Sequence, residues 1–108
     1  MENLAGLASA LHRLWFQHRD LTYSRLEQLR SALSAMESGD LAPHQQSEAL
    51  DAAHKLAGTL GTFGLDRATE AARKLQAILS SPATLNPSDV AEFRSQLQVL
   101  AADIESYR

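Results

Sequence analysis

The sequence predicts an all-α fold, an antiparallel up-down bundle of four helices. Its 108 residues are rich in alanine and leucine, a usage that favours helices over strands. Apolar residues recur at spacings of three and four along successive segments, which gives each segment one apolar face. Short connections with glycine or proline separate the segments, so neighbouring helices should run in opposite directions. A single domain, residues 1–108, accommodates the whole chain.

The first helical segment should extend from about Leu4 to Met36. The apolar spacing slips in register near Asp20, between an early and a late repeat. We therefore expect either one long helix with a kink or two helices that meet there. Three aromatic residues, Trp15, Phe16 and Tyr23, are interpreted as packing residues. The two repeats consist of Leu4, Leu7, Leu11 and Leu14, and of Leu26, Leu29, Leu33 and Met36.

The second helical segment should begin near Pro43 and end near Thr62. Gly39 suits the left-handed position that ends the preceding helix. Pro43 fits a first turn, where its missing N–H costs nothing, and Asp40 or Leu41 would form the cap region. The expected apolar face consists of Ala49, Ala53, Leu56, Leu60 and Phe63.

Two further helices complete the predicted bundle. Gly64 marks the break before the third helix, and Asp66 suits its N-cap or first turn. Ser80-Ser81-Pro82 should end that helix, and Asn86 followed by Pro87 is a strong start signal for the fourth. The apolar faces are Ala68, Ala71, Ala72, Leu75, Ile78 and Leu79, then Val90, Phe93, Leu97, Leu100, Ile104 and Tyr107.

The second segment contains the most informative stretch, in which His54 is followed by glycines at 58, 61 and 64. A glycine inside a helix costs about 1 kcal/mol relative to alanine, so two of them suggest that something approaches this backbone closely. On a helical wheel His54 lies a quarter to a third of a turn from the apolar face. The imidazole should therefore be exposed on a flat surface. Ser47, Asp51, Gly58 and Gly61 fall on the same side.

This stretch resembles the histidine-containing phosphotransfer (HPt) domains of multistep phosphorelays. The family pattern is a histidine, any residue, leucine, usually lysine, glycine and a small residue, with glycine ten residues after the histidine. The chain departs from it at Ala57, where the lysine is expected, and Lys55 points elsewhere. The matching residues are His54, Leu56, Gly58, Thr59 and Gly64, and Phe63 suits the apolar position before the last glycine.

The resemblance implies that His54 accepts a phosphoryl group from a receiver-domain phospho-aspartate and passes it to another receiver. Response-regulator receivers, and a hybrid histidine kinase, are therefore the expected partners. The receiver would supply the metal ion, so we expect no cofactor or metal site here, and a phosphocarrier without kinase activity of its own. The expected docking residues are Ser47, Asp51, Lys55, Gly58, Gly61 and Thr62, with electrostatic support from Arg73 and Lys74 if the second and third helices form a hairpin.

Composition argues against several other functions. The net charge of −3 gives no electrostatic support for nucleic-acid binding. The absence of cysteine excludes disulfides and thiolate chemistry. No apolar run approaches the roughly 20 residues that a membrane span needs, so the cytoplasm is the expected compartment. His12, His18 and His44 lack flanking glycines and are interpreted as solvated or half-buried.

Two alternatives stay open at the level of sequence. The chain could be a helical protein-interaction module in which His54 is never phosphorylated. It could also be the phosphorylated domain of a chemotaxis-type histidine kinase, separated from its catalytic domains and phosphorylated from ATP. Acid-labile, alkali-stable phosphate on His54 distinguishes the first alternative from a phosphocarrier. Neither the donor, the acceptor nor the output of the pathway can be read from the residues.

Overall fold

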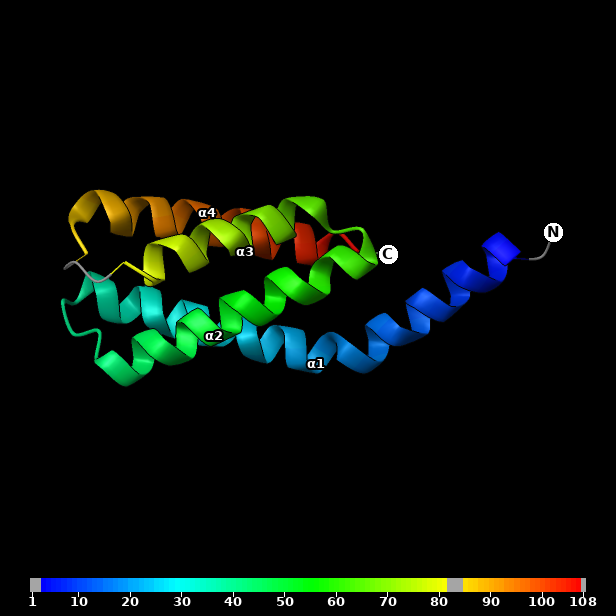
Figure 1. Ribbon diagram of the computed structural model, residues 1–108, viewed down its shortest axis with the longest axis horizontal. Coiled ribbons are helices and arrows are strands. Elements are labelled where there is room, and N and C mark those ends of the chain that lie inside the picture. The colour runs from blue at the N-terminus through cyan, green and yellow to red at the C-terminus, as the bar shows by residue number, and fades with distance from the viewer. Residues whose placement is uncertain (1–2, 82–84, 108) are drawn as a thin grey trace.

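The computed structural model describes residues 3–81 and 85–107, with side chains from residue 6 onward, and this part of the chain forms a four-helix bundle without strands (Figure 1). The predicted all-α fold is therefore confirmed. Within these residues no helix is long and apolar enough to cross a lipid bilayer. The elements are α1 (Asn3–Glu37), α2 (Pro43–Leu60), the 3₁₀ helix η1 (Gly61–Phe63), α3 (Asp66–Leu79) and α4 (Pro87–Glu105).

Helix α1 is one uninterrupted helix of 35 residues, so the alternative of two helices meeting near Asp20 is wrong. Its second half packs against α2 and α4, with Leu26 and Leu29 fully buried. Its first turns project beyond the end of the bundle (Figure 1). Leu7 and Leu14 are accordingly 56% and 42% exposed, although they continue the apolar repeat. The Leu4 side chain lies outside the described residues.

The aromatic residues of α1 divide between core and surface at the point where α1 leaves the bundle. Trp15 is buried, and its ring lies 5.3 Å from that of Phe63 and 4.6 Å from that of Tyr107. Tyr23 is half-buried against the core, as predicted. The prediction for Phe16 is wrong, because this side chain is 57% exposed and its ring contacts His12 and Arg19 of its own helix.

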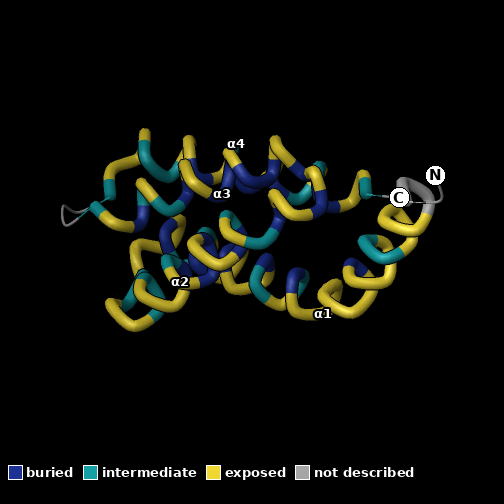
Figure 2. Tube along the Cα trace, turned by 45° about the vertical axis from the view of Figure 1, so that its right-hand side comes forward, coloured by how far each residue is buried: buried dark blue, intermediate teal, exposed yellow. Residues whose placement is uncertain are grey.

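The core between α2 and α3 is built largely from alanine and leucine. Small side chains allow two helices to approach closely, which brings residues at the edges of this interface within hydrogen-bonding reach. All five apolar residues predicted for the second segment are buried, and those predicted for the third are buried except Ile78, which is half-buried. Figure 2 shows the buried positions lining the inside of the bundle and exposed positions along the outer faces.

Local backbone chemistry fixes the helix ends. Gly39 and Gly64 both adopt φ of 73°, the left-handed region that glycine enters without steric cost. Asn86 caps α4, since its Oδ1 accepts a hydrogen bond from the Asp89 N–H at 2.8 Å. Helix α2 ends at Leu60, slightly earlier than the predicted end near Thr62, and the chain continues as η1 through Phe63.

The start of α2 differs from the prediction, whereas the start of α3 agrees with one of its two predicted forms. Ala42, rather than Asp40 or Leu41, is the N-cap of α2, and its N–H donates to the Gln45 side chain at 3.1 Å. Asp66 lies in the first turn of α3, one of the two positions predicted for it, and Leu65 occupies the N-cap. The Ala68 N–H in that turn donates instead to a carboxylate oxygen of Asp103 in α4, at 2.7 Å. A side chain from a different helix thus stabilises the start of α3.

Candidate functional site

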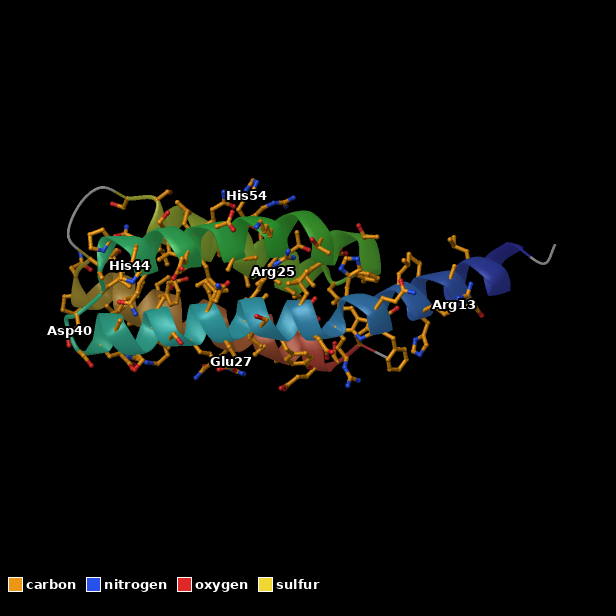
Figure 3. The ribbon with its side chains drawn as sticks, turned by 90° about the horizontal axis from the view of Figure 1, so that it is seen from below. Arg13, Arg25, Glu27, Asp40, His44 and His54 are labelled. Atoms are coloured by element: carbon orange, nitrogen blue, oxygen red, sulfur yellow. The ribbon has the colours of Figure 1, made fainter. Side chains whose placement is uncertain are left out.

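His54 lies near the middle of α2 on its outer side, as the wheel predicted (Figure 3). The residue before it, Ala53, is fully buried in the core, whereas His54 itself is exposed. The apolar stripe of α2 therefore anchors the helix and fixes the direction in which the imidazole leaves it. A rigid helix that presents one exposed histidine is a good platform for a reaction that depends on positioning.

The imidazole is held by a residue that the sequence reasoning did not identify. Gln76 of α3 is half-buried, and its Nε2 lies 3.1 Å from Nδ1 of His54. With the amide in this orientation its N–H donates to Nδ1, so the ring hydrogen resides on Nε2. Rotating the amide by half a turn places Oε1 opposite an Nδ1–H and frees the Nε2 lone pair. Gln76 can therefore orient the ring in both tautomers.

Asp51 and Lys55 form an ion pair on the same outer face, with 2.8 Å between the carboxylate and the ammonium. The hydrogen bond donated by Lys55 lowers the pKa of Asp51 below its ordinary value. Desolvation opposes this effect, and coulombic interactions with Lys55, His54 and Arg25 reinforce it. Asp51 is thus ionised and engaged with Lys55 at neutral pH, rather than hydrogen-bonded to His54. Arg25, from α1, is a second nearby residue that the sequence did not single out, and Figure 3 shows it where α1 passes α2.

The two helix glycines beside His54 differ in their surroundings. A Cβ built on Gly58 would meet nothing within 4 Å, so the space above this backbone is open. A Cβ on Gly61 would lie 3.7 Å from Oγ1 of Thr69 in α3, an ordinary van der Waals contact. Gly58 therefore contributes flatness on the outer surface, one turn along from the imidazole, whereas Gly61 lies over α3.

The remaining predicted site residues take different positions. Ser47, in the second turn of α2, and Thr62, in η1, are both exposed. Arg73 is exposed and lies 3.8 Å from Glu70 of its own helix. Lys74 is also exposed but lies on the edge of α3 turned away from α2, as its spacing from Gln76 requires. By helix spacing, Arg73 lies one turn from Gln76, the residue that contacts His54, whereas Lys74 lies on the opposite side of α3 from Gln76.

This arrangement provides a nucleophile held in a defined orientation on an accessible, flat surface. A neutral imidazole can attack phosphorus or carbon through its free nitrogen. Within residues 3–81 and 85–107, no three histidine, cysteine, aspartate or glutamate side chains gather as a metal site would require. The exposed imidazole and its contact with Gln76 make nucleophilic attack the chemistry that this arrangement favours.

Comparison with known proteins assigns nearly the whole chain to one family. Residues 2–104 match the Hpt domain family. Over 95 residues the chain is 30% identical to Protein RcaC of Microchaete diplosiphon, an alignment that covers 88% of this chain and 15% of RcaC. The chain thus spans a small part of the length of that relative. No solved structure matches the chain significantly.

Proposed function

Because this chain belongs to the Hpt domain family, whose members carry phosphoryl groups in histidine phosphorelays, we propose that His54 is its phosphorylated residue. Hpt domains exchange phosphoryl groups with receiver domains and are not autonomous kinases. The donor for His54 is then the phospho-aspartate of one receiver, and the acceptor is the aspartate of another. The observation that carries this proposal is the exposed imidazole whose Nδ1 lies 3.1 Å from the Gln76 amide. With the amide rotated so that Oε1 accepts from Nδ1–H, the Nε2 lone pair is free for the reaction.

In the accepting step, the Nε2 lone pair of His54 attacks the phosphorus in line with the leaving oxygen. The N–P bond forms as the P–O bond breaks, and the electron pair of the broken bond departs on the aspartate carboxylate. The phosphorylated ring retains its hydrogen on Nδ1 and carries positive charge. Oε1 of Gln76 accepts a hydrogen bond from this N–H in the rotated amide orientation, which stabilises the charged ring. The same steps in reverse deliver the group to the next receiver.

The outer face of α2 serves as the docking surface in this proposal. Gly58 and Gly61 have no side chains, so no atoms rise above the helix backbone there. An aspartyl phosphate can therefore reach Nε2 without a clash. The ion pair of Asp51 and Lys55 gives this face mixed charge, suited to polar contacts at the rim of a transient interface. Ser47 and Thr62 extend the surface at either end.

In this proposal the receiver partner supplies the metal site. The metal ion and the acidic residues that bind it belong to the receiver in this proposal, so the chain itself needs no cofactor. Docking to receivers, including one within a hybrid kinase, also places the phosphocarrier in the cytoplasm. The net charge of −3 disfavours nucleic acid as a partner.

The proposal is tested by phosphorylating the protein with a radiolabelled, acetyl-phosphate-charged receiver and with phosphoramidate as a receiver-independent donor. We expect acid-labile, alkali-stable phosphate on the wild-type protein and none on His54→Gln. The variant should melt like the wild type, because His54 is exposed. His44→Gln is the matched control, an exposed histidine of the same helix, and should accept phosphate normally.

Three results would contradict the proposal in different ways. Phosphate retained on His54→Gln means that another residue is the acceptor. No phosphate from any donor on a folded wild-type protein indicates an interaction module. Phosphorylation only by ATP and a separate kinase domain indicates the phosphorylated domain of a chemotaxis-type kinase.

A further inference from the structure

We propose that Arg73, on the neighbouring helix α3, holds the phosphoryl group once it is on His54. This inference rests on the proposed function, since it requires phosphorylation of His54. It assigns to one cation of the chain a positioning role that lies outside α2.

The register between α2 and α3 brings Arg73 to the site. Two contacts set this register, one between His54 and Gln76 and one between Gly61 and Thr69. The two contacts are seven residues apart in the chain on each side, from His54 to Gly61 and from Gln76 to Thr69. The register of the antiparallel pair is therefore the same at both contacts. Three residues along from the first contact, position 57 of α2 faces position 73 of α3. The only charged residue of this facing pair is the arginine, since Ala57 has no polar group.

The helical wheel of α3 places Arg73 on the correct edge. Gln76 and Thr69 contact α2, whereas the Ala68 N–H contacts α4. Arg73 precedes Gln76 by three residues and therefore lies one turn away, about 60° further from the core on the α2 side. Lys74 lies roughly 160° round from Gln76, on the α4 side.

Arg73 is also more available than the other cations near His54. Its guanidinium is 3.8 Å from Glu70, beyond hydrogen-bonding distance, and its side chain is 63% exposed. Lys55 is bound to Asp51 at 2.8 Å. The pKa of Asp51 is lowered chiefly by its hydrogen bond with Lys55 and, to a smaller extent, by the charge of Arg25. Arg25, on α1, therefore already interacts with an anion. A long, weakly engaged arginine at the edge of an open surface can turn toward a new anion at little cost.

The open space above Gly58 gives the phosphoryl group a place within reach of this arginine. Apart from the backbone of α2 itself and the residues next to Gly58 in the chain, no atom lies within 4 Å of a Cβ built at Gly58. By the register and the helical wheel, we infer that Arg73 of α3 can reach this space. The planar guanidinium offers two parallel N–H donors that match two phosphoryl oxygens. Phosphorylation would thus replace the loose contact with Glu70 by a bidentate one.

Such a contact should prolong the life of the phosphohistidine. Loss to water breaks the N–P bond through a loose transition state in which the phosphoryl oxygens donate electron density toward phosphorus. The products are inorganic phosphate and free imidazole, with the leaving electron pair returned to Nε2. A cation bound to the oxygens withdraws that density and slows the loss.

The test measures the lifetime of phosphohistidine, by ³¹P NMR, in proteins charged with phosphoramidate and then freed of it. We expect Arg73→Gln to shorten the lifetime about two- to fivefold, the size of an exposed charge-assisted contact, without lowering the melting temperature. Arg73→Lys should recover part of the loss. Lys74→Gln, which removes the adjacent charge on the other edge, should leave the lifetime unchanged.

A second-site variant provides a sharper criterion. Ala57→Lys in the Arg73→Gln background returns a cation to the facing position and should restore the lifetime. An unchanged lifetime in Arg73→Gln, or an equal loss in Lys74→Gln, overturns the role of Arg73 while His54 phosphorylation stands. A larger loss in Arg25→Gln than in Arg73→Gln transfers the role to α1 and likewise overturns it. Absence of phosphate on wild-type His54 defeats the proposed function itself.

Discussion

Helix α2 presents two faces whose residues alternate along the same few turns. Ala53 and Leu56 are fully buried. His54, which lies between them in the sequence, and Gly58, which follows them, are exposed. The inner face contributes to stability through burial of apolar surface. The outer face contributes little to stability, since the Asp51–Lys55 ion pair and the hydrogen bond between Gln76 and His54 are both exposed to solvent. The comparison teaches that fold and chemistry are separable here, and that each can be altered alone.

The largest effect on this comparison should come from the inner face. Leu56→Ala removes a fully buried side chain, which should reduce the free energy of unfolding by about 2–5 kcal/mol. Urea unfolding measures this loss. At a temperature where the variant is still folded, phosphorylation of His54 by phosphoramidate should proceed at the wild-type rate. A slowed rate in the folded variant would show that the two faces are coupled.

The outer face should respond in the opposite way at Gly58. Gly58→Gln should fold, and should stabilise the helix by up to about 1 kcal/mol, because glutamine is the better helix former. Its side chain fills the space one turn from the imidazole, so transfer from a phosphorylated receiver should slow about tenfold. Thermal melting and transfer kinetics on the same sample provide the two measurements.

Gly58→Ala is the control for this variant, since its methyl group meets nothing within 4 Å and transfer should stay close to wild type. Unfolding of Gly58→Gln would mean that Gly58 packs inside the protein. A folded variant with unimpaired transfer would place receiver docking elsewhere.

The smallest effect is expected at the boundary between the faces, where Ala57 is half-buried. Ala57→Lys should be tolerated, since a lysine stem can cover apolar surface while its charge reaches water. With Arg73 already present, the added cation should change the phosphohistidine lifetime by less than about twofold. Lifetimes of the single variant and the wild type, measured side by side, decide the matter. A large increase would mean that no cation yet serves the site.

The bundle and the exposure of His54 could be predicted because both follow from local periodicity. The same logic overestimated the packing of α1. Leu7 and Leu14 obey the spacing that buries Leu26 and Leu29, but periodicity identifies an apolar face and not the partner that covers it. The partners α2 and α4 have 18 and 19 residues, against 35 in α1, so they cannot cover its whole length.

The parts of the site that came only from the structure depend on contacts between helices. Gln76 is one polar residue among many on α3 until the register with α2 places it at Nδ1 of His54. The capping of α3 by Asp103 likewise joins residues 35 apart in sequence. No spacing rule within one helix contains this information. The role of His54 itself stays a prediction that the resemblance supports and the phosphorylation experiment tests.

The projecting start of α1 has a consequence for how the molecule opens locally. Inside the bundle, a backbone hydrogen bond of α1 breaks only when the packing of several helices is lost. On the N-terminal side of His12, whose ring stacks 6.1 Å from that of Tyr107, the described side chains of α1 are mostly exposed. There the helix is maintained mainly by its own propagation, and isolated helical segments of this length are marginal in water. The free energy of local opening therefore declines along α1 from Leu29 toward its first turns, within a single unbroken helix.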